Sequence, residues 1–238
     1  MIRAALALIV GAIPAIAQAQ AYRCAVPQQV PRPRADVPSA SQPKRVLPIG
    51  GYTLALTWAA QFCHENGREA GAALECGRGN RFGFTLHGLW PDGEGASWPQ
   101  YCRATGIVPP AVIRRQLCAT PSAQLIQHEW AKHGTCMSAT PEAYFAAATR
   151  LYGDLRYPDM GALSRRRALT AGDVARALAA ANPGIAPGMM RITANRQGWL
   201  EEVWLCLDKR LRYATCPAHQ RGLAVDTPIK VWRGGLRR

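Results

Sequence analysis

The sequence has no internal repeat, and beyond Ile16 it has no apolar run long enough to cross a membrane. The first absence argues against a solenoid or a propeller, and the second argues against a membrane-spanning protein. No pair of cysteines is separated by two residues, which disfavours a zinc site of the Cys-x-x-Cys type. With 238 residues, 48% of them hydrophobic, the chain is long enough for one domain with a sizeable core.

Acidic residues are scarce. The chain has 15 Asp and Glu against 29 Lys and Arg, which gives a formal net charge of +14 at pH 7. An excess of this size favours polyanionic partners, nucleic acid above all, because the field of the protein attracts them. A basic surface can also serve solubility alone, so the charge by itself does not decide the function.

The first residues have the pattern of a secretory signal. Arg3 gives a positive start, an apolar run extends from Ala4 to Ile16, and Ala17-Gln18-Ala19 is a small-x-small cleavage site. The sequence therefore predicts a signal peptide over residues 1–19. We expect a soluble protein without a membrane anchor, located in the periplasm or secreted from the cell.

All eight cysteines follow the predicted cleavage site. An even number of cysteines in an exported chain indicates up to four disulfides, formed in an oxidising compartment. The sequence alone leaves their pairing open. The cysteines are Cys24, Cys63, Cys76, Cys102, Cys118, Cys136, Cys206 and Cys216.

The order of predicted elements indicates the α+β class. Residues 20–48 are rich in proline and basic residues and are expected to form an extended arm. Strands are predicted over 52–62, 81–86, 189–194 and 199–207, and helices over 117–132, 141–154 and 170–181. Strands, then helices, then strands favour a central antiparallel sheet with helices packed mainly on one side. We expect one disulfide-stapled domain over 49–238, ending in a basic tail.

Three boundaries are specific enough to be tested. The first strand is expected to end near Cys63 and to be followed by a glycine-rich loop up to Asn80. Residues 87–92 are expected to be the exit from the second strand, since Pro91 cannot donate to a ladder. Thr120-Pro121 is the predicted start of the helix that ends near Lys132, as a cap followed by a first-turn proline. Thr140-Pro141 has the same pattern at the start of the second helix, and Thr170 or Asp173 is the predicted start of the third.

The densest set of ionisable groups is His128-Glu129-Trp130-Ala131-Lys132-His133-Gly134-Thr135-Cys136. On an α-helix, at about 100° per residue, its four ionisable side chains share one side, and Trp130 and Ala131 face the other. A single helical histidine is more often structural than catalytic, but four clustered groups favour acid/base chemistry. A zinc-protease helix spaces its histidines four apart. Here they are five apart with Lys132 between them, which disfavours a metal site.

A second segment, Phe84-Thr85-Leu86-His87-Gly88-Leu89-Trp90-Pro91-Asp92, precedes the first by about 40 residues. Together the two segments closely resemble the active-site segments of the ribonuclease T2 family. Both are long and they occur in the family's order. The resemblance covers roughly 52–216 and leaves the arm and the basic tail outside it.

This resemblance implies an exported endoribonuclease that cleaves single-stranded RNA with low base specificity. It makes His133 the general base and His87 the general acid of an attack by the 2′-hydroxyl on phosphorus, through a 2′,3′-cyclic phosphate. Histidine suits both roles near neutral pH. Lys132 and Glu129 would stabilise the phosphorane, and His128 would bind the phosphate. No metal or other cofactor is expected, and we expect a monomer.

The resemblance also suggests substrate-binding residues and a disulfide pattern. Trp90 and Asp92 fall where the family stacks a base and hydrogen-bonds its edge, and Trp98 lies near another stacking aromatic. Each has a structural alternative: a core tryptophan for Trp90, a turn residue for Asp92 and a surface residue for Trp98. The disulfide pairs implied are Cys63 with Cys76, Cys102 with Cys136 and Cys206 with Cys216, which leaves Cys24 with Cys118.

An alternative from another functional class is a binding protein. It would have the same fold without catalytic activity, and would bind RNA or another polyanion. The presence of all five residues assigned to catalysis disfavours it. A metal hydrolase is disfavoured by the five-residue spacing of the two helical histidines.

Overall fold

The computed structural model describes residues 21–234. The predicted signal peptide and the last four residues of the basic tail lie outside them. No helix within the described residues is both long enough and apolar enough to span a membrane.

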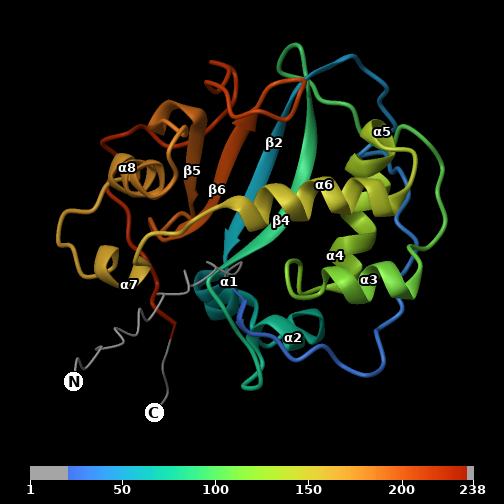
Figure 1. Ribbon diagram of the computed structural model, residues 1–238, viewed down its shortest axis with the longest axis horizontal. Coiled ribbons are helices and arrows are strands. Elements are labelled where there is room, and N and C mark those ends of the chain that lie inside the picture. The colour runs from blue at the N-terminus through green and yellow to red at the C-terminus, as the bar shows by residue number, and fades with distance from the viewer. Residues whose placement is uncertain (1–20, 235–238) are drawn as a thin grey trace, which may run out of the picture.

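An antiparallel sheet of four strands, in the order β4-β2-β6-β5, forms the centre of the molecule (Figure 1). Its strands are β2 (Ile49–Trp58), β4 (Phe84–Gly93), β5 (Met190–Ala194) and β6 (Leu200–Leu207). A second, two-stranded sheet pairs β1 (Ala21–Arg23) with β3 (Arg81–Phe82), also antiparallel. The central antiparallel sheet of the predicted α+β class is confirmed.

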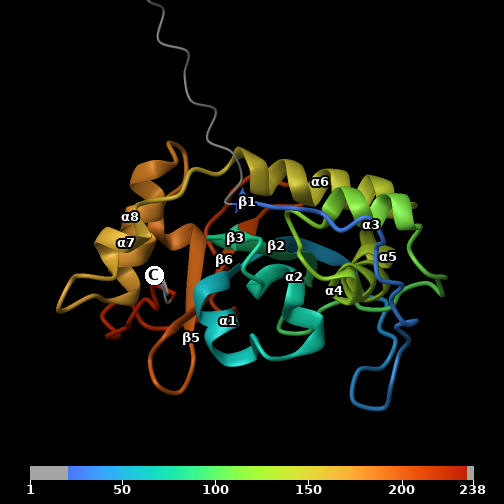
Figure 2. The same ribbon diagram turned by 90° about the horizontal axis from the view of Figure 1, so that it is seen from below.

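Helices lie on both faces of the sheet and beyond both of its edge strands. In Figure 2, α6 (Pro141–Asp154) and α3 (Pro110–Gln116) lie on one side of the strands, and α1 (Ala59–Asn66) and α2 (Ala73–Cys76) on the other. Beyond β5 lie α7 (Met160–Leu163) and α8 (Ala171–Ala181). Beyond β4 lie α4 (Ala123–His128), η2 (Glu129–Gly134) and α5 (Thr135–Met137). Two short 3-10 helices, η1 (Ala70–Ala72) and η3 (Pro187–Met189), precede α2 and β5.

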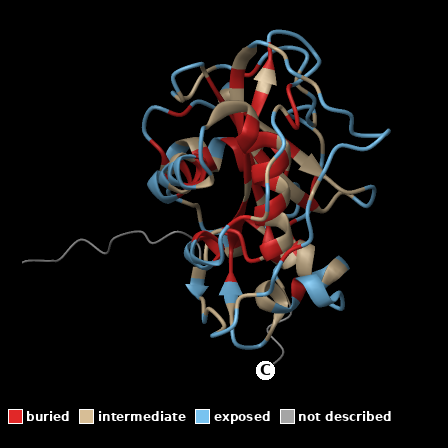
Figure 3. Cartoon of the chain, turned by 90° about the vertical axis from the view of Figure 1, so that its right-hand side faces the viewer, coloured by how far each residue is buried: buried red, intermediate tan, exposed pale blue. Residues whose placement is uncertain are grey.

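Helix α6 anchors the core to β4. Its buried residues Tyr144, Ala148, Leu151 and Tyr152 recur at helical spacing and form the apolar face turned to the sheet. The Tyr152 hydroxyl donates to the Phe84 carbonyl at 2.7 Å, and the Tyr144 hydroxyl to the Leu89 carbonyl at 3.1 Å. The buried segments of Figure 3 form one continuous core between helix and sheet. Burial and hydrogen bonds therefore fix the position of β4, which carries His87.

The predicted start signals of two helices are confirmed. The Thr140 side chain caps α6 by accepting from the Ala143 amide. Thr170 caps α8 in a capping box with Asp173. Both signals are local, which is why the sequence sufficed to find them.

Three predicted boundaries are wrong. The first strand ends at Trp58, and Cys63 lies in α1, so the segment up to Asn80 is helical over much of its length. The strand carrying His87 does not end before it, because β4 continues through Pro91 to Gly93. β4 is at the edge of the sheet, where the missing amide proton of Pro91 costs no ladder bond.

The predicted helix over 117–132 is interrupted at its start. Thr120 does not cap it: its hydroxyl donates to the Leu86 carbonyl at 2.7 Å. Ser122 is the cap, because its side chain accepts from the Leu125 amide. The helix preceding it, α3, begins at a proline and was not predicted.

Four disulfides staple the fold in the pattern that the resemblance implies. Cys102–Cys136 joins the loop after β4 to α5, and Cys24–Cys118 ties the arm to the body. Cys63–Cys76 and Cys206–Cys216 close shorter loops. The arm lies along the α3, α4 and α5 side of the molecule, where it is drawn in blue in Figure 1.

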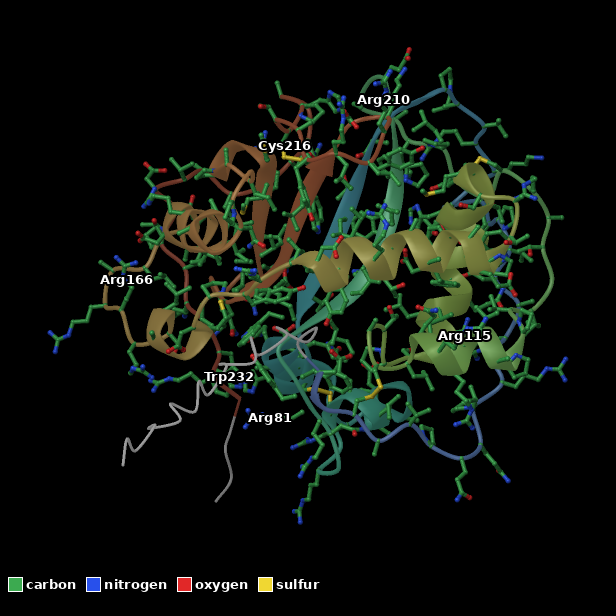
Figure 4. All side chains as sticks on the ribbon, viewed as in Figure 1. Arg81, Arg115, Arg166, Arg210, Cys216 and Trp232 are labelled. Carbon is green, nitrogen blue, oxygen red and sulfur yellow. A yellow bond between two sulfur atoms is a disulfide. The ribbon has the colours of Figure 1, made fainter. Side chains whose placement is uncertain are left out.

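Positive charge is spread over the surface. Figure 4 shows Arg81, Arg115, Arg166 and Arg210 at widely separated places. The basic charge of these residues is therefore not gathered into one patch.

Candidate active site

A β-bulge in β4 turns His87 into the site. Ala55 of β2 pairs with Gly88, and the next residue, Leu56, pairs with Leu86, so that His87 is the extra residue. The bulge moves Gly88 and Trp90 to the face that carries His87, whereas strict alternation would place them on the opposite face. As a result the His87 and Trp90 rings meet at 5.0 Å between centroids.

The helix that carries the second motif is a π-helix from Glu129 to Gly134, which corrects the α-helix expected there. The Thr135 amide donates to the Trp130 carbonyl, five residues back. In such a turn the backbone hydrogen bond joins residues five apart, which brings their side chains closer to one face than an α-helix does, and π-helical turns are frequent at functional sites. His128 and His133 are five apart, and their ring centroids lie 6.2 Å from each other.

Glu129 is the residue on which the two motifs meet. It is 1% exposed. Its Oε2 accepts from Trp90 Nε1 at 2.9 Å, and its Oε1 lies 3.6 Å from His87 Nε2. The Trp90 ring in turn stacks on His133 at 5.6 Å. The structure thus brings together all five residues that the resemblance assigns to catalysis, with Trp90 between them.

The two principal histidines have opposite pKa shifts. Burial, then the charges of Lys132, His128 and His87, hold the pKa of His133 well below its usual value. Burial also lowers the pKa of His87, but the hydrogen bond to Glu202 and the charge of Glu129 outweigh it and raise the pKa overall. At pH 6.5, the ordinary pKa of histidine, His133 is therefore mostly neutral and His87 mostly protonated. Pairs of groups with pKa values pushed apart mark acid and base roles.

Burial raises the pKa of Glu129 to about 7, against the lowering effects of His87 and the Trp90 hydrogen bond. A carboxyl group with such a pKa exchanges a proton readily near neutral pH. Burial also lowers the pKa of Lys132, which Glu129 and Asp36 partly offset.

Two carboxylates outside the motifs hold histidines of the site, and no pattern in the sequence indicates either. Glu202 in β6 lies 2.6 Å from His87 Nδ1 and also accepts from Trp204 Nε1 at 2.7 Å. Asp36 in the arm lies 2.5 Å from His128 Nδ1. Both depend on contacts between segments far apart in the chain.

The donor set could also hold a metal ion. Ligand atoms of His128, Glu129 and His133 lie within 4.8 Å of one another. The charge of Lys132 lowers the pKa of both histidines, and the same charge opposes a bound cation. The arrangement therefore suits acid/base chemistry better than metal binding.

A cleft of about 630 Å³ opens beside His87 and His128. Six carboxylates line it, those of Asp36, Glu65, Glu69, Glu75, Glu201 and Glu202. Burial raises the pKa of Glu75 to about 7, partly offset by its hydrogen bond from Thr85. This wall of the site is acidic although the chain as a whole is basic.

Two of the three predicted substrate residues lie away from the histidines. Asp92 is five residues farther along β4, roughly 16 Å for an extended strand, and accepts from the Thr53 hydroxyl at 2.7 Å. Trp98 is 45% exposed, with the Arg45 guanidinium 4.8 Å from its ring centroid. Trp90 is inside the cluster, and its ring contacts His87, His133 and Trp204.

Comparison with known proteins agrees with this geometry. The model of the Ribonuclease T2 family matches residues 49–216. The chain belongs to the ribonuclease T2 family. The match begins at the start of β2 and includes both motifs, and it leaves the arm with Asp36 outside.

Two bacterial relatives are 27% and 30% identical to this family member over the residues that align. A protein of Haemophilus influenzae named "Probable ribonuclease" is 27% identical over 180 residues, 71% of this chain and 61% of that protein. A protein of Aeromonas hydrophila named "Ribonuclease" is 30% identical over 163 residues, 66% of this chain and 71% of that protein. The chain thus spans less than two thirds of the Haemophilus protein.

Solved structures share the fold. RNase NT, determined in complex with 5′-AMP, gives a TM-score of 0.60 at 22% identity and covers 77% of this chain and 98% of its own. An RNase-related protein from Calystegia sepium gives a TM-score of 0.59 at 24% identity, and the match covers 76% of this chain and 98% of that protein.

Gly88 leaves the space that Glu129 occupies. A Cβ atom at Gly88 would lie 1.7 Å from Glu129 Oε2 and 2.8 Å from Trp90 Nε1. We predict that Gly88→Ala displaces the buried carboxylate and lowers kcat/KM for RNA cleavage by roughly 100-fold, the scale of a misplacement of about 1 Å.

The matched control is Gly153→Ala. Gly153 is exposed near the end of α6 and has open space around its Cβ position, so this variant should keep the activity and raise the melting temperature slightly. A wild-type kcat/KM for Gly88→Ala, measured on the folded protein, would show that the Glu129 position is not needed.

Proposed function

We propose that the protein is an exported endoribonuclease that cleaves single-stranded RNA by transesterification. The 2′-oxygen forms a bond to phosphorus, and the bond from phosphorus to the 5′-oxygen breaks. His133 takes the proton of the 2′-hydroxyl, and His87 gives its proton to the departing 5′-oxygen. The products are a 2′,3′-cyclic phosphate and a free 5′-hydroxyl, and slower hydrolysis of the cyclic ester would use the same histidines in exchanged roles.

The observation that carries this proposal is the opposite protonation of the two histidines in one site. A general base must be neutral and a general acid must hold its proton before the reaction begins. The lowered pKa of His133 and the raised pKa of His87 provide this pair. Among the described residues, buried His133 Nδ1 has no hydrogen-bond partner. That nitrogen is therefore not committed to another group.

Lys132, Glu129 and His128 are assigned to the phosphate. A cation near the developing negative oxygens stabilises the transition state, and one such donor is typically worth about 3 kcal/mol. His128 Nδ1 is held by Asp36, which leaves Nε2 for a phosphate oxygen. Glu129, with its pKa near 7, would hold or release a proton as the phosphorane forms and breaks down.

The substrate class rests on charge and on the relatives. The net charge of +14 favours a polyanion, and the related RNase NT was determined with 5′-AMP. Low base specificity is consistent with aromatic stacking, which is sequence-tolerant. We assign base stacking to exposed Trp98 and recognition of the base edge to Asp92. Four disulfides support export to an oxidising compartment such as the periplasm.

A catalytically silent RNA-binding protein remains the second candidate, and no feature of the site favours it over the enzyme. A binding protein has no need for two histidines poised in opposite protonation states.

The first prediction from this mechanism concerns His133. Yeast RNA should be cut by the wild type at about pH 5 to 7, leaving 2′,3′-cyclic ends. His133→Ala should lose at least about 10²- to 10⁴-fold in rate, the usual contribution of a general base. His64→Ala is the control, because His64 stacks on Trp232 outside the site. A correctly disulfide-bonded wild type that cuts no RNA would favour the binding protein instead.

The second prediction concerns metals. Activity should be the same with and without EDTA, because both proton transfers and the charge stabilisation are assigned to side chains. The measurement is the rate on yeast RNA after dialysis against EDTA. Loss of activity that Zn²⁺ or Mg²⁺ restores would reject the metal-free mechanism.

A further inference from the structure

We propose that Asp36 is a positioning residue for His128, so that the N-terminal arm forms part of the active site. Asp36 lies outside the region that matches the family, in the arm at residues 20–48, to which the sequence analysis assigns no role. The proposal rests on the proposed function of His128 as a phosphate-binding group. It adds to that function a residue, and a segment, that the two motifs do not contain.

The contact itself is direct. Asp36 Oδ2 lies 2.5 Å from His128 Nδ1, and both side chains are largely withdrawn from solvent, at 15% and 28% exposed. A carboxylate only accepts, so Nδ1 carries the proton and the other ring nitrogen, Nε2, is left free. This is the arrangement in which a second group fixes the tautomer and orientation of a functional imidazole.

Asp36 is held in place by a residue with a rare backbone conformation. Its Oδ1 accepts from the Tyr101 hydroxyl at 2.8 Å. Tyr101 is buried and has φ +50°, an uncommon value for a residue other than glycine. The Tyr101 amide donates to the Lys132 carbonyl at 2.8 Å. The hydroxyl that orients Asp36 is therefore fixed to the catalytic helix through its own backbone.

The arm is fastened on both sides of Asp36. Cys24–Cys118 attaches its beginning to the body. The backbone of Arg34 exchanges hydrogen bonds with the Gln124 side chain, two residues before Asp36. Arg45 and Gln100 pair through their backbones beyond it. The position of Asp36 is thus determined by several contacts and does not depend on the His128 bond alone.

The charge of Asp36 also acts on His128. Burial lowers the pKa of His128, and the hydrogen bond and charge of Asp36 are the effects that raise it. An imidazolium binds phosphate better than a neutral imidazole, so removal of the carboxylate should weaken phosphate binding first at the upper end of the active pH range. The charged or titratable groups around His128 are Asp36 from the arm, Glu129, Lys132 and His133 from η2, His87 from β4, and Tyr101 through Asp36.

The test compares three substitutions by steady-state kinetics on a dinucleoside phosphate. Asp36→Asn keeps an acceptor but removes the charge, and should raise KM about tenfold with kcat within about twofold. Its KM should begin to rise with pH at a lower pH than in the wild type, because the His128 pKa falls. Asp36→Ala should raise KM more than Asp36→Asn does. Asp36→Glu should have a KM between those of Asp36→Asn and the wild type.

Two controls separate positioning from general effects. Asp154→Asn removes one exposed carboxylate on α6, whose one ion pair within residues 21–234 is a 4.0 Å contact with Arg150, and should leave KM unchanged. Arg114→Ala removes the hydrogen bond from α3 to the carbonyl of Gln28, which precedes Asp36 in the arm by eight residues, and should also leave KM unchanged. A tenfold rise of KM in Arg114→Ala would mean that arm docking, and not Asp36, sets the affinity.

A second readout does not need activity. Nitrogen chemical shifts of the His128 ring, followed against pH in the full-length mature protein, report its tautomer and its pKa. The neutral ring should carry its proton on Nδ1, and Asp36→Asn should lower the His128 pKa. An unchanged tautomer in Asp36→Ala together with an unchanged pKa in Asp36→Asn would overturn the proposal. If the wild type cuts no RNA, the proposed function fails, while these shifts still decide whether Asp36 holds His128.

Discussion

The buried carboxylate of Glu129 is the constraint on which the site depends. It is placed on a π-helical turn, bonded to the Trp90 indole, paired with His87 and accommodated by a glycine across from it. Burying a carboxylate is costly unless partners compensate. The charge of His87, the Trp90 hydrogen bond and the charge of Lys132 favour the ionised form of Glu129, whereas burial opposes it. The charge of Glu129 is one of the effects that raise the pKa of His87, whereas burial and the nearby cationic groups lower the pKa of His133, so the two histidines differ in protonation within one small volume.

Strand β4 connects that site to the core. Its core-facing residues are bound by α6 through the tyrosine hydroxyls, and its other face carries His87 and Trp90. One extra residue in the pairing of β4 with β2 separates the side chains that face the core from those that face the site. The bulge lets the strand present Leu86 and Leu89 to the core and still present His87 and Trp90 to the site. Strand β4 therefore serves both the core and the proposed catalytic site, each with its own side chains.

The two motifs and the cap signatures could be found from the sequence because each lies within a few adjacent residues. The bulge at His87 could not, since it depends on the register with β2. The π-helix could not either, because no residue type distinguishes it from an α-helix before its packing is known. Glu202 and Asp36 come from segments that precede or follow the motifs by tens of residues. Their contacts arise only from the tertiary fold. The strand boundary predicted from Pro91 is wrong because a proline is accepted in an edge strand, and the sequence alone does not show that β4 is one.

The claim that His87 acts as the general acid can be tested with a change of leaving group. A nucleoside 3′-phosphate esterified with p-nitrophenol releases an anion that needs no proton, whereas a dinucleoside phosphate releases an alkoxide that does. We expect His87→Ala to lose about 10²- to 10⁴-fold on the dinucleoside phosphate and to remain within about tenfold of the wild type on the aryl ester. An equal loss on both substrates would contradict the assignment, and would show that His87 acts on binding or on the attacking oxygen instead.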